Sequence, residues 1–185
     1  MISTMLDERK VRSPKTQATT LQEVAETICA DAIRQTQAKF DPFQQEPNGE
    51  GLLRRNDFFD SLKYNLAKGV ANTLAASDDH VLDIYLSDPS VNPDAESGEY
   101  LSVDAIVHLL VLVRVSSAAL KTFIGSLDRA LVQQLKDTPL PLPAKCSSIL
   151  DVMLVTEDEV ERGTGYANLL RSIFAPPLKI WQREV

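Results

Sequence analysis

The sequence has few cysteines, no long apolar run and no excess of basic residues. Its two cysteines, Cys29 and Cys146, lie far apart in the 185 residues, and they provide neither a disulfide framework nor a zinc-binding pattern. We therefore expect two reduced thiols, as in a cytoplasmic protein. The longest apolar run, residues 109–113, is far too short to span a bilayer, and residues 1–15 lack the apolar stretch of a signal peptide. The expectation is a soluble, cytoplasmic protein.

The charge of the chain argues against two classes of partner. The chain carries 26 acidic and 19 basic residues, a net charge of −7 and a pI of about 4.9. Clustered lysine and arginine are needed to bind a nucleic acid backbone or an anionic lipid surface, so we expect neither nucleic acid nor membrane as a partner. Hydrophobic residues make up 44% of the chain, which is enough for the core of a single domain.

Turn signals and helical patterns divide the chain into four parts. Thr20 and Glu23 form a capping box ahead of apolar residues at helical spacing. The predicted parts are a flexible polar tail at 1–19, a helix at 20–39, a linker at 40–55 and a folded domain at 56–185. The narrow apolar stripe of the first helix fits docking on this domain or on another chain, and both alternatives stay open.

Within residues 56–185 the pattern predicts strands separated by helices. Strands are expected at 80–87, 103–115, 148–155 and 178–182, and helices are expected to begin at 56 or 57, at 116 or 117, and at 156. The order is α-β-β-α-β-α-β, preceded by the extra N-terminal helix. The predicted fold class is α/β (α+β), a small mixed β-sheet covered by helices. The near-continuous apolar character of 103–115 indicates a strand buried on both faces.

Two ionisable residues interrupt apolar strands and are the candidate catalytic groups. His108 lies in the second predicted strand and Asp151 in the third. An imidazole acts as a general base when a partner orients it, and Asp151 on a neighbouring strand is the expected partner. The structural alternatives are a buried neutral histidine bonded to the backbone and an aspartate with only a structural role at a sheet edge.

The order of elements, with four sequence strings, resembles the minimal nucleotidyltransferase fold of the polymerase-β-like superfamily. VLDIYLSDPS at 81–90 is similar to the first strand and its turn, and VDAIVHLLVLV at 103–113 to the strand that carries Asp-x-Asp. ILDVMLVTEDEVER at 149–162 resembles the strand with the third carboxylate, and PPLKIWQRE at 176–184 resembles the closing strand. The resemblance covers residues 57–185.

The resemblance also implies that the active site is degenerate. Asp88-Pro89 stands where the family has a Gly-Ser turn, and proline has no amide to offer a phosphate. Ile106 and His108 stand where the family has the paired carboxylates that hold Mg²⁺, a cation that prefers oxygen ligands. Only Asp151 matches the third carboxylate.

A shifted metal site is the alternative to a degenerate one. Eight carboxylates and no lysine or arginine lie between Asp78 and Asp104, namely Asp78, Asp79, Asp83, Asp88, Asp94, Glu96, Glu99 and Asp104. Asp88, Asp104 and Asp151 are the candidate metal ligands of such a site. The simpler interpretation is that these acids form a solvated loop and a strand edge. We therefore expect no cofactor, and Mg²⁺ only if the protein is active.

These observations favour a non-enzymatic role. The predicted function is that of a catalytically degenerate, nucleotidyltransferase-like protein that acts as a binding or regulatory partner in a protein assembly, with a protein partner or a second copy of itself. One alternative is an active Mg²⁺-dependent enzyme that moves a nucleoside monophosphate onto a small molecule or protein. A second alternative is an unrelated α+β interaction module.

Overall fold

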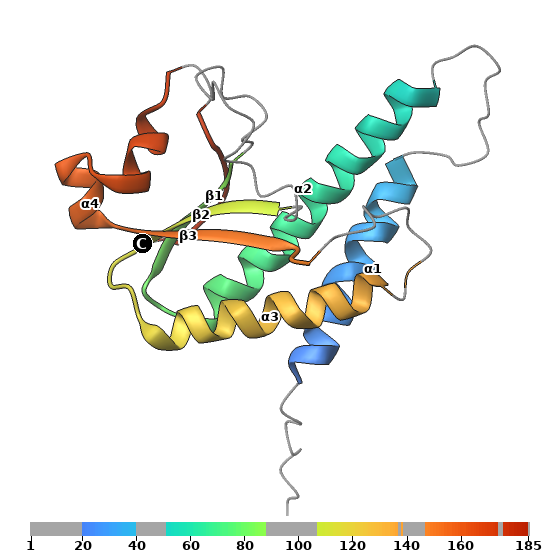
Figure 1. Cartoon of the computed structure of the whole chain (residues 1–185), viewed down its shortest axis with the longest axis horizontal. Helices are drawn as coiled ribbons and strands as arrows, with labels where there is room; N and C mark the ends of the chain where they lie inside the picture. The colour runs from blue at the N-terminus through green and yellow to red at the C-terminus, as the bar shows by residue number, and fades with distance from the viewer. Residues whose placement is uncertain are drawn as a thin grey trace, which may run out of the picture.

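The computed structural model describes residues 20–39, 51–87, 107–136, 138, 147–173 and 176–184, with only the backbone for 51–57. Figure 1 shows helices packed on a twisted sheet. The helices are α1 (Leu21–Lys39), α2 (Gly51–Ser77), α3 (Ala118–Lys136), α4 (Glu157–Arg162) and the 3-10 helix η2 (Gly165–Arg171). The strands are β1 (Val81–Ser87), β2 (Val107–Val113), β3 (Leu150–Thr156) and β4 (Leu178–Gln182). No helix of these residues is long and apolar enough to cross a membrane.

The four strands form one mixed sheet in the order β3-β2-β1-β4. β1 pairs antiparallel with both β2 and β4. β2 and β3 are parallel, and the chain between them includes α3, because parallel neighbours need a crossover connection. The predicted order α-β-β-α-β-α-β and the predicted mixed α/β class are therefore confirmed.

The main core lies between the sheet and helices α1, α2 and α3. β2 alternates across the sheet, with Val107, Leu109, Val111 and Val113 facing this core. The strand is buried almost throughout, as its continuous apolar character predicted. The largest fully buried side chains of the helices in this core are Leu62, Leu66, Leu74, Leu127, Leu131 and Leu135. These positions recur at the helical period, so each helix presents an apolar face to the sheet or to its neighbours.

α1 packs on the domain rather than standing apart. Its small side chains Ala25, Cys29 and Ala32 are buried in the main core, and Figure 1 shows α1 beside α2 and α3. The helices approach closely where Gly69 of α2 faces Ile28 of α1. A Cβ added to Gly69 would lie 2.9 Å from Cγ2 of Ile28. The absence of a side chain at residue 69 therefore allows the two helices to pack.

The capping box predicted at Thr20 is present, and a second capping box opens α4. The amide of Thr20 donates to Oε2 of Glu23 at 2.7 Å, and the amide of Glu23 donates to the Thr20 hydroxyl at 3.3 Å. Thr156 and Glu159 form the same reciprocal pair at the start of α4. In each case two otherwise unsatisfied amides at a helix N-terminus are paired.

The opposite face of the sheet carries a smaller apolar cluster beneath α4 and η2. Leu110 of β2 and Val155 of β3 are buried there against Ala167 of η2. α4 ends at Gly163, whose φ of 64° lies in the left-handed region that favours glycine. The 3-10 helix η2 follows, and its first residue, Gly165, also has a positive φ.

The structure corrects several predicted boundaries, and the third strand, for example, is Leu150–Thr156 and not 148–155. α2 begins at Gly51, so residues 51–55 belong to a helix and not to the predicted linker at 40–55. Leucine and arginine at 52–55 are good helix formers, which outweighed the capping signals of Asn56 and Asp57. The second strand ends at Val113 rather than at residue 115, and the remaining predicted part at 103–106 lies outside the described residues.

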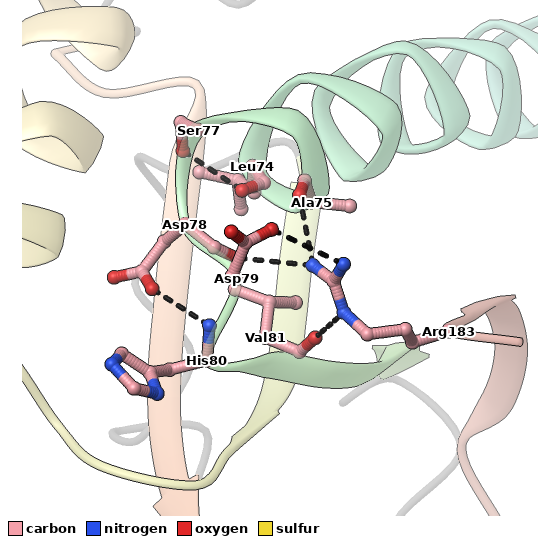
Figure 2. Close-up of polar contacts among 8 residues, drawn as sticks. All are labelled: Leu74, Ala75, Ser77, Asp78, Asp79, His80, Val81 and Arg183. Atoms are coloured by element: carbon pink, nitrogen blue, oxygen red, sulfur yellow. Dashed lines mark hydrogen bonds and ion pairs between the residues drawn. The ribbon is translucent and has the colours of Figure 1, made fainter. Parts of the chain in front are cut away.

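Arg183, just after β4, ties the C-terminal strand to the end of α2. Its Nε donates to the carbonyl of Val81 at 2.9 Å, and its Nη2 donates to the carbonyls of Ala75 at 3.1 Å and Asp78 at 3.2 Å. Figure 2 shows the guanidinium among these carbonyls, with the Asp79 carboxylate beside it. The last carbonyls of a helix lack intrahelical partners, so a fixed cation at this position stabilises the α2–β1 turn.

Candidate functional site

His108 and Asp151 meet on the sheet face that points away from α1, α2 and α3. They are direct neighbours in the parallel register of β2 and β3. Nδ1 of His108 lies 3.0 Å from Oδ2 of Asp151. An ionised carboxylate can only accept a hydrogen bond, so Nδ1 donates the hydrogen to Asp151. The structure thus brings together the two residues singled out as catalytic candidates.

The two side chains of this pair differ in their access to solvent. The side chain of His108 is 10% exposed and that of Asp151 is 45% exposed. The carboxylate orients the imidazole and assigns its tautomer, which is the arrangement a general base requires. Asp151 lies on β3, the outermost of the described strands on this side of the sheet, and its role stays open. His108 is buried and bonded to a side chain, whereas its structural alternative had a backbone partner.

Ser87 lies on the other side of His108 from Asp151. Ser87 and His108 are directly paired in the antiparallel register of β1 and β2, so their side chains share one face of the sheet. Hydroxyl, imidazole and carboxylate therefore follow one another across β1, β2 and β3. Of these three side chains, His108 and Asp151 are hydrogen-bonded to each other.

A second polar group on this face was missed by the sequence interpretation. The Asp83 carboxylate accepts from the Tyr85 hydroxyl at 3.1 Å and from Nζ of Lys179 at 3.1 Å. Burial, followed by the Asp83 charge, raises the pKa of Tyr85. The spacing of Asp83 and Tyr85, two residues apart in a strand, predicts a shared face. Nothing in the sequence indicated that Lys179, 96 residues later, would join them.

The structure describes one of the three predicted metal ligands. Asp151 is in β3, while Asp88 and Asp104, like Ile106, lie outside the described residues. Among the residues that are described, no group of three or more histidine, cysteine or acidic side chains could hold a metal ion. The convergence of Asp88, Asp104 and Asp151 therefore stays a prediction.

A groove of about 720 Å³ runs along the outer edge of β3 and includes Asp151. Residues 151–154 of the strand line its floor. α3 contributes Lys121 and Ile124 to one wall, while Glu159 of α4 and Tyr166 of η2 line the other. In Figure 1 the β3 arrow passes above α3 and ends at α4. The edge of β3 is thus recessed between helical elements on the two faces of the sheet.

The backbone of β3 points alternately toward β2 and toward this groove. In a parallel pair, the amides and carbonyls of alternate residues face the partner strand. The amide of Val107 donates to the carbonyl of Ile149 at 2.8 Å, so residues 151, 153 and 155 also face β2. The backbone groups of residues 150, 152, 154 and 156 consequently point outward. β2 is the one strand beside β3 in the described part of the chain.

Carboxylates occupy the two ends of this outward edge. The amide of Leu150 donates to Oδ1 of Asp128 at 2.8 Å, and the amide of Thr156 donates to Oε2 of Glu159 at 2.8 Å. The amide and then the hydroxyl of Thr156 lower the pKa of Glu159, which keeps this carboxylate ionised. Between these two ends, residues 152 and 154 present their outward amides and carbonyls to the groove.

No protein-family model matches the chain, and neither a curated protein nor a solved structure does. We therefore infer function from the side chains and contacts described above.

Proposed function

We propose that this chain is a binding or regulatory partner in a protein assembly, built on a catalytically degenerate nucleotidyltransferase-like scaffold. The element order and the mixed sheet agree with what that resemblance leads one to expect. The proposal depends above all on the contact between His108 and Asp151.

The chemistry of this contact favours a degenerate site. Asp151 corresponds to the third carboxylate of the resembled family, and its Oδ2 holds Nδ1 of His108 at 3.0 Å. His108 in turn corresponds to one of the paired metal-binding carboxylates. At these two positions the chain therefore has an imidazole bonded to a carboxylate where the family has two acids, and Mg²⁺ strongly prefers oxygen ligands. A scaffold altered in this way keeps its surfaces for binding other proteins while it loses the means to hold a metal–nucleotide complex.

The same proposal includes a cytoplasmic location, where thiols stay reduced. Cys29 is buried in the main core and is not part of a disulfide. This agrees with a protein that folds without oxidation.

Thermal unfolding of the whole chain with nucleotides tests the proposal. ATP, GTP, CTP and UTP are added in turn at millimolar concentration, with and without Mg²⁺. A ligand that binds only the folded state raises the unfolding temperature, so a degenerate protein is expected to show no Mg²⁺-dependent rise with any of the four.

Two variants identify the site responsible if a rise is seen. Asp151→Ala removes the remaining carboxylate, and Asp31→Ala removes an equally exposed carboxylate from α1. Each variant is compared with its own nucleotide-free unfolding temperature. A Mg²⁺-dependent rise that persists in Asp31→Ala and disappears in Asp151→Ala would overturn the proposal in favour of an active nucleotidyltransferase.

A further inference from the structure

We propose that the groove along the outer edge of β3, lined by residues 151–154 and called the β3-edge groove below, binds a single extended peptide segment of a partner protein. The segment adds to the sheet as a fifth strand beside β3. The inference rests on the proposed role as a binding partner and specifies the surface and the kind of segment it takes. Strand addition at an exposed edge obtains its affinity from main-chain hydrogen bonds and its specificity from alternate side chains.

The hydrogen-bonding groups for such a strand lie in the middle of β3. Leu150 and Thr156, at the two ends, have their amides bonded to Asp128 and Glu159. Val152 and Leu154 lie between them and line the groove. Their outward amides and carbonyls have the spacing of two residues that an added strand matches. The site therefore suits a short segment that contacts the middle of β3 and not its ends.

The walls of the groove favour a lone strand over a second copy of this chain. Lys121 and Ile124 rise on the α3 side, and Glu159 and Tyr166 rise on the other side. In a second copy, β3 is recessed between the same helices. Because paired strands lie about 4.7–4.9 Å apart, two edges that are both recessed cannot come close enough to pair. An extended segment without flanking helices fits between the walls.

The chemistry of the two walls predicts the sequence of the segment. Val152, Leu154 and Ile124 belong to the main core side of the sheet, so one set of alternate side chains of the added strand would contact an apolar wall. Asp151 and Glu159 line the opposite side, and the other set would meet carboxylates. Alternation of apolar and basic residues is the expected pattern.

Further charges near the groove agree with a basic partner. Among the described residues that line the groove, Asp151 and Glu159 are acidic and Lys121 is basic. α4, which contributes Glu159 to the groove, also carries the exposed acids Glu157 and Glu161. The net charge of the chain, −7, also attracts a basic segment at long range. Tyr166 is 59% exposed at the groove and provides an aromatic surface of the kind found at binding hot spots.

Peptide selection on the full chain, followed by backbone modification, tests the inference. Random dodecapeptides displayed on phage are selected against the protein, and the affinity of an enriched peptide is measured by fluorescence anisotropy. We expect enrichment of alternating apolar and basic residues, with affinity that weakens as salt is added. N-methylation of alternate peptide amides should abolish binding in one register and leave it nearly unchanged in the other.

A pair of variants at one position isolates the outward amide of β3. Val152→Ala and Val152→Pro both lose the valine side chain, but only proline also removes the backbone N–H. Because this N–H points outward at the sheet edge, its removal leaves the hydrogen bonds between β3 and β2 intact. We expect Val152→Pro to bind the peptide about tenfold more weakly than Val152→Ala. If Val152→Pro does not fold, the N-methylated peptides give the same information with the unaltered protein.

Three outcomes would overturn the inference. The first is the absence of any enriched peptide, and the second is binding that is insensitive to both Val152→Pro and N-methylation. The third is a concentration-dependent dimer of the protein that Val152→Pro disrupts, because such a dimer would identify a second copy as the occupant. The nucleotide test is independent, because a Mg²⁺-dependent rise that is lost in Asp151→Ala would contradict the proposed function whether or not the unaltered protein binds the peptide.

Discussion

The imidazole of His108 and the carboxylate of Asp151 meet across two parallel strands, with Nδ1 3.0 Å from Oδ2. The two residues are 43 positions apart, and the register of β2 and β3 sets them side by side. Because His108 is buried and Asp151 is half-exposed, the contact joins the interior of the sheet to the β3-edge groove.

Removing the carboxylate of this pair should destabilise the protein. Asp151→Ala leaves the buried Nδ1–H of His108 without its acceptor, and an unsatisfied buried donor costs about 1–3 kcal/mol. Urea unfolding should show this loss. Asp31→Ala is the control, because Asp31 has the same exposure, 45%, and pairs with the exposed Arg34 one turn away on α1. Its loss should stay below about 0.5 kcal/mol, and equal losses in the two variants would contradict a specific role for the His108–Asp151 contact.

Two glycines inside helices should respond to alanine in opposite ways. Gly69→Ala adds a Cβ 2.9 Å from Cγ2 of Ile28, and overpacking of this kind costs about 1–3 kcal/mol, which outweighs the gain in helix propensity. Gly125→Ala adds a Cβ with nothing within 4 Å, so the propensity gain of about 1 kcal/mol remains. Thermal unfolding of both variants checks the signs. A stabilised Gly69→Ala would show that α1 and α2 are not in tight contact there.

Arg183 should contribute to stability through its geometry as well as its charge. Arg183→Ala leaves the carbonyls of Ala75, Asp78 and Val81 without the guanidinium that binds them, for an expected loss of about 2 kcal/mol. Arg183→Lys keeps the charge but cannot reach all three carbonyls with one ammonium group, so an intermediate loss is expected. Urea unfolding measures both, and amide exchange in β4 should accelerate. A lysine variant as stable as the unaltered protein would reduce the role of Arg183 to its charge.

The thiol of Cys29 should resist alkylation in the folded protein. Burial raises the pKa of Cys29 to about 12, so the thiol stays protonated at pH 8, and only the thiolate reacts. Iodoacetamide labelling followed by mass spectrometry should show modification of Cys29 only after unfolding in urea. Ala30→Cys, at the adjacent exposed position of α1, is the control and should react about a hundredfold faster. Equal labelling of the two positions in the folded chain would contradict the packing of α1.

Local signals in the sequence predicted most of the elements and their order. The capping boxes at Thr20 and Thr156 and the alternation around Ile84 act within a few residues, so they can be recognised without knowledge of the fold. Boundaries failed where two local signals competed. Good helix formers at 52–55 extended α2 past its predicted start at 56 or 57, and the helix predicted to begin at 156 ends at Arg162, where Gly163 adopts the left-handed conformation.

The candidate site could be anticipated only in part. His108 and Asp151 were recognisable because ionisable groups are unusual in apolar strands. The hydrogen bond between them, the place of Ser87 beside His108 and the bond from Lys179 to Asp83 depend on strand register. No local pattern encodes register between segments far apart in the chain.

The sequence by itself determined the α-β-β-α-β-α-β order, the helix caps and the two apolar strands interrupted by His108 and Asp151, because periodicity and capping are properties of neighbouring residues. Only the tertiary structure decided that β3 is the edge strand among the described strands and that residues of α3, α4 and η2 line the groove on its outer side. It also decided that Arg183 reaches back to α2. Strand order and helix placement result from burying the apolar faces of all the elements together, and this is a property of the whole fold.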